Sequence, residues 1–138
     1  MGAVNIKIDG LEKTLARFDV KKFEPKIQEC FDKFGLRVEL ESKQAVIVDD
    51  GRLKNSIFQE PGRLSSTVGA SADYAAYVEF GTGPYAAKYV SILPKQWQEL
   101  AMTFYVNGKG RLPAHPYLYP SFNKAKDKLI EDLNKIKI

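Results

Sequence analysis

The segment from Lys26 to Val48 constrains the fold most, because its apolar residues recur with the period of an α-helix. Pro25 is tolerated only in the first turn of a helix and places the start near Glu24, while Asp49-Asp50-Gly51 closes the helix and turns the chain. An apolar stripe follows the i, i+3, i+4, i+7 spacing and comprises Ile27, Cys30, Phe31, Phe34, Val38 and Ala45. This long helix must therefore lie along the core of the protein.

A second apolar stripe lies almost opposite the first on the same helix and comprises Leu36, Leu40 and Ile47. A helix that buries one face against its own domain has little use for a second stripe. Two explanations stay open: these residues are a candidate subunit interface, or a loop or the C-terminal helix of the same chain covers them. Gly35, in the middle of the helix, indicates close approach by a neighbouring backbone.

A β-hairpin is predicted after the long helix. Arg52 to Glu60 has the pattern of a strand, Pro61-Gly62 suits positions i+1 and i+2 of a type II turn, and Leu64 to Ala70 alternates apolar and polar residues. Val4 to Ile8 predicts a further short strand, and residues 10 to 18 predict a short helix. The hairpin should bury one face and leave the other face polar.

The segment from Tyr74 to Gly83, YAAYVEFGTG, is an aromatic anchor that ends at two glycines. Tyr74, Tyr77 and Val78 fit the spacing of a short helical turn that begins after the capping residues Ser71-Ala72-Asp73 and ends at Gly81, with a strand as the alternative.

Glu79 is the one carboxylate in this apolar run. It is either partly buried and paired, with Arg52 or Arg63 as candidate partners, or it points into solvent. The sequence does not decide between these two interpretations.

The region from Gly83 to Pro113 has a helical pattern that begins at Pro94 and includes Trp97, Leu100, Ala101 and Phe104. A candidate mobile loop follows it and consists of Asn107, Gly108, Lys109 and Gly110. The loop lacks the spacing of a phosphate-binding P-loop.

A final helix starts at Tyr119-Pro120, and its single apolar stripe comprises Phe122, Ala125, Leu129, Leu133 and Ile136. The predicted fold class is α+β, in which a small antiparallel sheet carries the long helix and the C-terminal helix on one side. The length of 138 residues suits one domain, 1–138, with an inserted helix and loop at about 84–113.

Composition argues against catalysis. Cys30 and His115 are the single cysteine and histidine, so one copy cannot form a disulfide or a Cys/His metal cluster. We expect a buried, inert thiol at Cys30 and a spacer or hydrogen-bonding role for His115. No pair of carboxylates, nucleophile with its base or nucleotide loop emerges from the sequence, so we expect no enzyme, no catalytic residue and no cofactor.

The formal charge of +4 is mild, and the C-terminal lysines alternate with acidic residues, which is typical of a solvated helix face. A small basic nucleic-acid-binding module remains an alternative. No apolar run approaches the length of a membrane helix, and the N-terminus lacks the layout of a signal peptide. We therefore expect the chain to stay in the cytoplasm unless a larger assembly exports it.

Three blocks occur in order: GRLKNSI at 51–57, YAAYVEFGT at 74–82 and PYLYP at 116–120. Together they resemble the tail-completion or head-to-tail joining family of long-tailed bacteriophages and prophages, whose pattern is G-x-L-[RK]-x-S-[IL], then Y-A-x-[YF]-V-E-[FY]-G-T, then A-x-P-[FY]-[LM]-x-P before a last helix. The resemblance runs from Gly51 to the C-terminus, apart from residues 84–112. The matching positions, for which the resemblance implies a structural role, are Gly51, Leu53, Ser56, Ile57, Tyr74, Ala75, Tyr77, Val78, Glu79, Phe80, Gly81, Thr82, Pro116, Tyr117, Leu118 and Pro120.

The resemblance implies a structural virion protein that completes the top of a phage tail and joins it to the head connector as a homo-oligomeric ring. Its implied partners are copies of itself, tail tube or terminator proteins and head connector proteins, with DNA passing through the lumen without sequence-specific contacts. The implied location is the neck of the virion, after assembly in the host cytoplasm. A tail-terminator or other neck ring subunit is the alternative within the same class.

Overall fold

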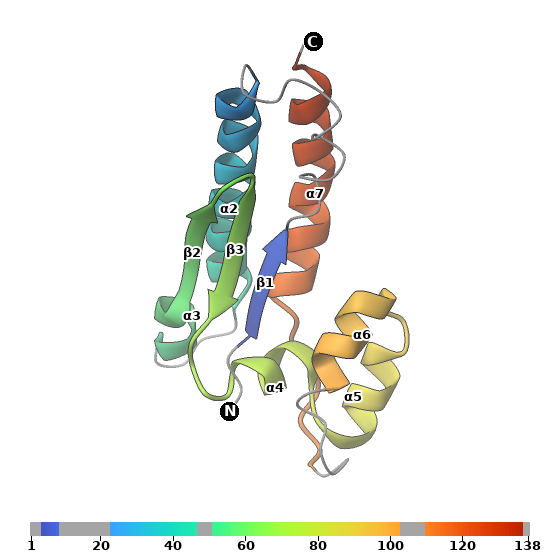
Figure 1. Cartoon of the computed structure of the whole chain (residues 1–138). Coiled ribbons are helices and arrows are strands. Elements are labelled where there is room, and N and C mark those ends of the chain that lie inside the picture. Colours follow the sequence, from blue (N-terminus) through green and yellow to red (C-terminus); the bar gives the residue numbers. More distant parts are fainter. Residues whose placement is uncertain (1–3, 9–22, 47–50, 103–109, 137–138) are drawn as a thin grey trace.

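The structure is a computed structural model that describes residues 4–8, 23–46, 51–102 and 110–136 (Figure 1). It confirms the α+β class. Strands β1 (Val4–Ile8), β2 (Ile57–Gly62) and β3 (Ser65–Ala70) form an antiparallel sheet in the order β1-β3-β2. Val68 in the central strand β3 pairs with Ile6 on one side and with Gln59 on the other. The short N-terminal strand predicted from alternation is therefore present and joins the hairpin.

Two long helices, α2 (Glu24–Ala45) and α7 (Leu118–Asn134), lie side by side on the same face of the sheet (Figure 1). The Gln28 side chain fastens α2 to the hairpin, because its Oε1 accepts the backbone N–H of Leu64 at 2.7 Å and its Nε2 donates to the Gly62 carbonyl at 2.7 Å. Gly35 is required where α2 meets the sheet, since an added Cβ would collide with the Ser66 hydroxyl and the Gln59 side chain. The approach to Gly35 is therefore by side chains of the sheet, not by the predicted backbone.

The apolar stripe of α2 forms the core as predicted, with one exception. Ile27, Cys30, Phe31, Phe34 and Val38 are all buried. Ala45 is exposed, because it is the last residue of α2 and lies beside an open pocket next to Pro120 in the first turn of α7. On α7, Ala125 and Leu129 are buried, and Phe122, Leu133 and Ile136 pack against the core, so the single-stripe prediction for this helix is confirmed.

The prediction for the start of the hairpin was wrong in two respects. Residues Arg52–Ser56 form the helical turn α3, in which the Ser56 hydroxyl donates to the Leu53 carbonyl at 2.8 Å, so β2 begins only at Ile57. Pro61 and Gly62 lie inside β2, where they pair with Ser66 and Ser65. Proline is tolerated there because β2 is an edge strand.

The hairpin turns instead at residues 63 and 64. Leu64 has a positive φ of 51°. Its buried side chain and its N–H bond to Gln28 supply the tertiary contacts that hold this uncommon conformation.

Three short helices, α4 (Ala75–Phe80), α5 (Gly83–Val90) and α6 (Lys95–Met102), follow the hairpin. The predicted helical turn ending at Gly81 is confirmed as α4, and the strand alternative was wrong. The expected capping by residues 71–73 is absent, since Tyr74 is the N-cap and makes no side-chain cap bond. Helix α6 was predicted, whereas α5 was not.

Helices α5 and α6 stand beside the body of the protein (Figure 1). Several predictions lie outside the described residues: the helix at 10–18, Ile47, Phe104 and the loop residues Asn107, Gly108 and Lys109. Within the described ranges, no helix is both long enough and apolar enough to cross a membrane.

Candidate functional site

The fully buried carboxylate of Glu79 connects α4 to the start of α7. Its Oε1 accepts the backbone N–H groups of Tyr117 at 2.9 Å and Leu118 at 2.6 Å, and its Oε2 accepts the N–H of Tyr119 at 3.2 Å. The first N–H groups of a helix have no partner within the helix, and the N-cap residue Tyr117 provides no side-chain cap. Glu79 therefore caps α7 from a separate segment of the chain.

Of the two sequence-based interpretations of Glu79, the solvent-exposed one was wrong, and the buried one was right about burial but wrong about the partner. The side chain is neither in solvent nor paired with an arginine, because Arg52 contacts Asp73 and Arg63 contacts Glu24. Desolvation raises the pKa of Glu79 to about 7, and the three backbone hydrogen bonds to Leu118, Tyr117 and Tyr119 oppose this shift. The positive end of the α7 dipole is the other feature that favours the charged form.

Further hydrogen bonds bind the same two segments. The Tyr117 hydroxyl donates to the Ala75 carbonyl at 2.8 Å, and the His115 backbone N–H donates to the Val78 carbonyl at 2.8 Å. Burial raises the pKa of Tyr117 above its ordinary value, so its hydroxyl stays protonated and available as a donor. The bond from His115 uses its backbone alone and does not depend on the imidazole.

Gly81 and Thr82 extend this contact. Gly81 has a φ of 78°, and a Cβ there would lie 2.8 Å from the Ala114 nitrogen and 2.9 Å from the Leu112 oxygen. Thr82 N–H donates to the Leu112 carbonyl at 2.9 Å, while Thr82 Oγ1 accepts the Leu112 N–H at 2.7 Å. The second block is therefore joined to the third block and to residues 112–115 that precede it.

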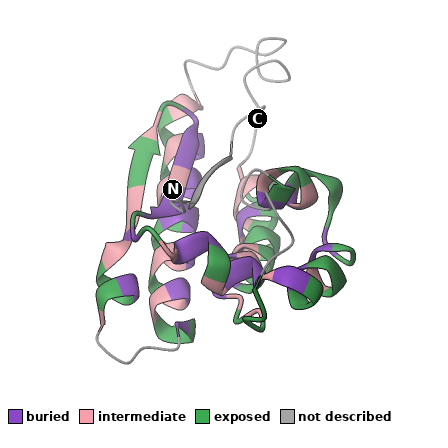
Figure 2. Ribbon diagram, turned by 90° about the horizontal axis from the view of Figure 1, so that it is seen from below, coloured by how far each residue is buried: buried purple, intermediate pink, exposed green. Residues whose placement is uncertain are grey.

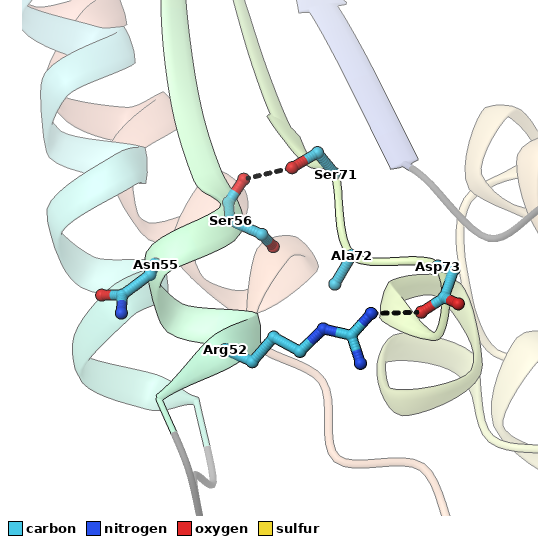
Figure 3. Close-up of a pocket in the computed structure, with 6 residues that line it drawn as sticks. All are labelled: Arg52, Asn55, Ser56, Ser71, Ala72 and Asp73. Atoms are coloured by element: carbon cyan, nitrogen blue, oxygen red, sulfur yellow. Dashed lines mark hydrogen bonds and ion pairs between the residues drawn. The ribbon is translucent and has the colours of Figure 1, made fainter.

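A shallow polar pocket of about 550 Å³ joins the first block to the residues before the second block (Figure 3). Arg52 lies 3.4 Å from Asp73 and over the ring of Tyr74, and the Ser56 carbonyl accepts the backbone N–H of Ser71 at 3.1 Å. The Ser71 hydroxyl points to the same carbonyl (Figure 3). These contacts fix the end of the hairpin against the start of α4. The pocket opens widely to solvent, and the ion pair between Arg52 and Asp73 at its edge is solvent-exposed.

Trp97 of α6 attaches this helix to the body of the protein. Its ring packs edge to face against Tyr119 at 5.0 Å, Phe122 at 5.6 Å and Phe80 at 6.5 Å between centroids. The buried residues of α4 lie in the middle of the molecule, whereas α5 and α6 carry many exposed residues (Figure 2). Helices α5 and α6 are thus anchored on one side and open on the other.

Several large apolar side chains are exposed among the described residues. Leu36 and Leu40 on α2 are 49 % and 58 % exposed, and Ile92 between α5 and α6 is 76 % exposed. The others are Tyr77, Tyr85, Met102, Leu112 and Ile130. On α2, the core, the sheet and α7 occupy the opposite side, so none of the described elements covers Leu36 and Leu40.

The block residues divide between core and surface. Those that are buried are Leu53, Ile57, Ala75, Glu79, Phe80, Gly81, Tyr117 and Leu118. Gly51 adopts a left-handed conformation at the N-cap of α3, and its carbonyl accepts the N–H of Asn55. These residues position the hairpin, α4 and α7 relative to one another, which is a structural role.

Cys30 is buried, and burial raises the pKa of its thiol, which disfavours the reactive thiolate.

Sequence reasoning missed the capping role of Glu79, although a signal existed. The helix at Tyr119-Pro120 begins without Ser, Thr, Asp or Asn at its N-cap, so its first N–H groups need an acceptor from elsewhere. Glu79, a carboxylate enclosed by apolar residues, needs donors. The helix supplies the donors that the carboxylate needs, and the carboxylate supplies the acceptor that the helix needs.

Comparison with known protein families places part of the chain in a bacteriophage family. Residues 7–81 match the family described as "Bacteriophage HK97-gp10, putative tail-component". The matched range contains the first block and the second block up to Gly81, ends before the block at 116–120, and begins well before Gly51, where the motif resemblance started. No curated protein and no solved structure matches the chain.

The matched range covers more than half of the 138 residues and spans α2, the hairpin and α4. A component of a phage tail resides in the virion and has a structural role. The chain belongs to the HK97-gp10-like family of bacteriophage tail components.

Proposed function

We propose that this protein completes the top of the tail as a homo-oligomeric ring and joins the tail to the head connector. The observation that carries the proposal is the exposure of Leu36 and Leu40 on the side of α2 away from the core. Exposed apolar residues on a helix whose other side is already buried are typical of a surface that contacts another protein. A second copy of the chain is the partner that a ring requires.

A contact between unlike surfaces that closes on itself gives a ring with two different faces. Such a ring can bind the tail on one face and the head on the other. The chain supports this arrangement with a rigid frame, in which buried hydrogen bonds fix α4 and α7, and with exposed residues on α2 and on the inserted α5 and α6. Subunit surfaces held on a rigid frame lose little freedom on assembly.

The mass of the purified protein in solution tests the ring. We expect an oligomer for the wild type and a folded monomer for Leu36→Asp and Leu40→Asp. Ile130→Asp on α7 is the matched control, because Ile130 is 48 % exposed and lies on a different helix. A monomeric wild type under all conditions, or an oligomer that tolerates both aspartates, would contradict this interface.

The joining role needs a separate test in a phage that lacks this protein. Filled heads and complete tails should accumulate unjoined, and the purified protein should restore joined particles. Tails of uncontrolled length would instead support the tail-terminator alternative.

The nucleic-acid-binding alternative receives little support from the described lysines of α7. Lys128 and Lys135 lie within 3.5 Å of carboxylates on their own helix, and Lys124 lies 3.6 Å from Glu41 of α2. A carboxylate beside a lysine weakens the attraction of that lysine for phosphate groups. A steep fall of DNA affinity with salt would nevertheless favour that function.

A further inference from the structure

The hydrogen bonds of Glu79 are unequal, and this inequality determines what a proton would do. Oε1 accepts two N–H groups, from Tyr117 and Leu118, and Oε2 accepts one, from Tyr119, at the longest of the three distances, 3.2 Å. An ionised carboxylate accepts at both oxygens, whereas a neutral carboxyl group carries a donor O–H on one of them. The proton is best placed on Oε2, because there it breaks only the long bond from Tyr119. On Oε1 it would break the two shorter bonds from Tyr117 and Leu118.

Glu79 is the group in its surroundings that changes charge near neutral pH, because the neighbouring titratable groups are phenols with raised pKa values. The titratable side chains that interact with its charge are Tyr89 of α5 and Tyr117 before α7, and burial raises the pKa of both phenols above the ordinary value. Both phenols therefore stay neutral in the range where a carboxyl group changes charge. Neither α2, α6 nor the sheet contributes an ion pair to Glu79 within the described ranges.

The two forms of the carboxyl group are closely balanced. The ionised form makes three hydrogen bonds but carries a buried charge that has no counter-ion among the described residues, while the neutral form removes the charge and gives up the Tyr119 bond. Desolvation raises the pKa of Glu79 to about 7, so both forms are populated around neutral pH.

We propose that Glu79 is a proton-sensitive latch, which holds the backbone of Tyr119 in the first turn of α7 when ionised and releases it when protonated. The ring of Tyr119 packs on Trp97 at 5.0 Å, so release of this turn loosens the anchor of the inserted α5 and α6. The latch lies where α4 of the family-matched region meets the insertion and α7. It gives the exposed inserted helices a position that depends on pH.

Amide hydrogen exchange of the oligomer or monomer as purified, read by NMR and corrected for intrinsic rates, tests the latch. We expect the protection of the Tyr119 amide to fall on the order of tenfold as the pH is lowered from 8.5 to 5.5, the effect of losing one hydrogen bond to a charged group. The Ile27 amide, bonded to Phe23 in α2, serves as the internal reference and should keep its protection.

Two controls separate the latch from other effects. Glu79→Gln should give a weakly protected Tyr119 amide at every pH, because an amide group cannot ionise. The backbone of His115 bonds Val78 next to Glu79, so both proteins are also measured in a His115→Gln background.

The latch would be overturned by a Tyr119 protection that does not change with pH in the wild type, or that changes equally in Glu79→Gln. The ¹³C shift of the Glu79 carboxyl group gives a second readout that needs no variant. A carboxyl group that titrates near the ordinary value for glutamate would also overturn the latch.

Discussion

The backbone N–H of Leu118 donates a 2.6 Å hydrogen bond to Glu79 Oε1 across 39 residues of sequence. This bond lies at the centre of the contact between the second and third sequence blocks, in a region with no solvent exposure. The carboxylate accepts the first N–H groups of α7, which no side chain at the N-cap satisfies. In turn, the positive end of the helix dipole faces a carboxylate that has no ion-pair partner among the described residues. The two segments therefore stabilise each other, and this dependence leads to the first prediction.

Replacing Glu79 by alanine should lower the free energy of unfolding by about 3 kcal/mol or more, because three buried N–H groups lose their acceptor at once. Chemical denaturation measures the change. Glu79→Gln is the matched control and should cost less, since its carbonyl oxygen can still accept from Tyr117 and Leu118. A loss below about 1 kcal/mol for alanine would mean that water replaces the carboxylate.

The stability of the wild type relative to Glu79→Gln should depend on pH in a defined direction. The folded pKa is raised from 4.5 to about 7, so the folded state binds the proton more tightly than the unfolded state. The stabilisation from the neutral form is fully present below about pH 4.5 and is lost as the pH rises through 7, by roughly 3 kcal/mol in all. Asp132, Glu24 and Glu131 have lowered pKa values and act in the opposite sense, but they cancel in the difference between the two proteins. A difference that grows with pH would reverse this assignment.

Gly35→Ala should destabilise the protein by about 1 to 3 kcal/mol, although alanine favours helices more than glycine does. The added methyl group meets the Ser66 hydroxyl and the Gln59 side chain, where the hydrogen bond between Gln59 and Ser66 limits relaxation. Thermal unfolding measures the loss. Ser66→Ala should recover part of it in the double variant, and Gln44→Ala on the exposed side of α2 should be nearly neutral. An unchanged melting temperature for Gly35→Ala would show that the sheet moves away from α2.

Trp97→Ala should lower the free energy of unfolding by about 3 to 5 kcal/mol, the usual cost of deleting a large buried aromatic side chain. The expectation follows from its edge contacts with Phe80 of α4 and with Tyr119 and Phe122 of α7. Equilibrium denaturation should remain a single transition. Ile92→Ala at the exposed turn is the control and should change stability by less than about 0.5 kcal/mol. A near-neutral Trp97→Ala would mean that α6 does not share the core.

The elements that the sequence predicted well are those with a local periodic signal. Glu24–Ala45 and Leu118–Asn134 carry apolar stripes over several turns, and the observed helices begin within two residues of the predicted starts. The strand at Ser65–Ala70 was visible from alternation, and the turn before Gly81 from the spacing of Tyr74, Tyr77 and Val78. The short helices α3 and α5 were missed, since five to eight residues give little periodicity to detect.

The sequence by itself determined the α+β class, the long helix with its two stripes, and the three blocks that indicate a phage tail component. Tertiary structure alone decided that the hairpin turns at Leu64, that Leu36 and Leu40 are left exposed, and that Glu79 binds the start of α7. The physical reason is the separation along the sequence of the residues that interact. Periodicity reports which side of one element is apolar, whereas the partner of a buried carboxylate and the cover of an apolar stripe depend on segments that meet only when the chain folds.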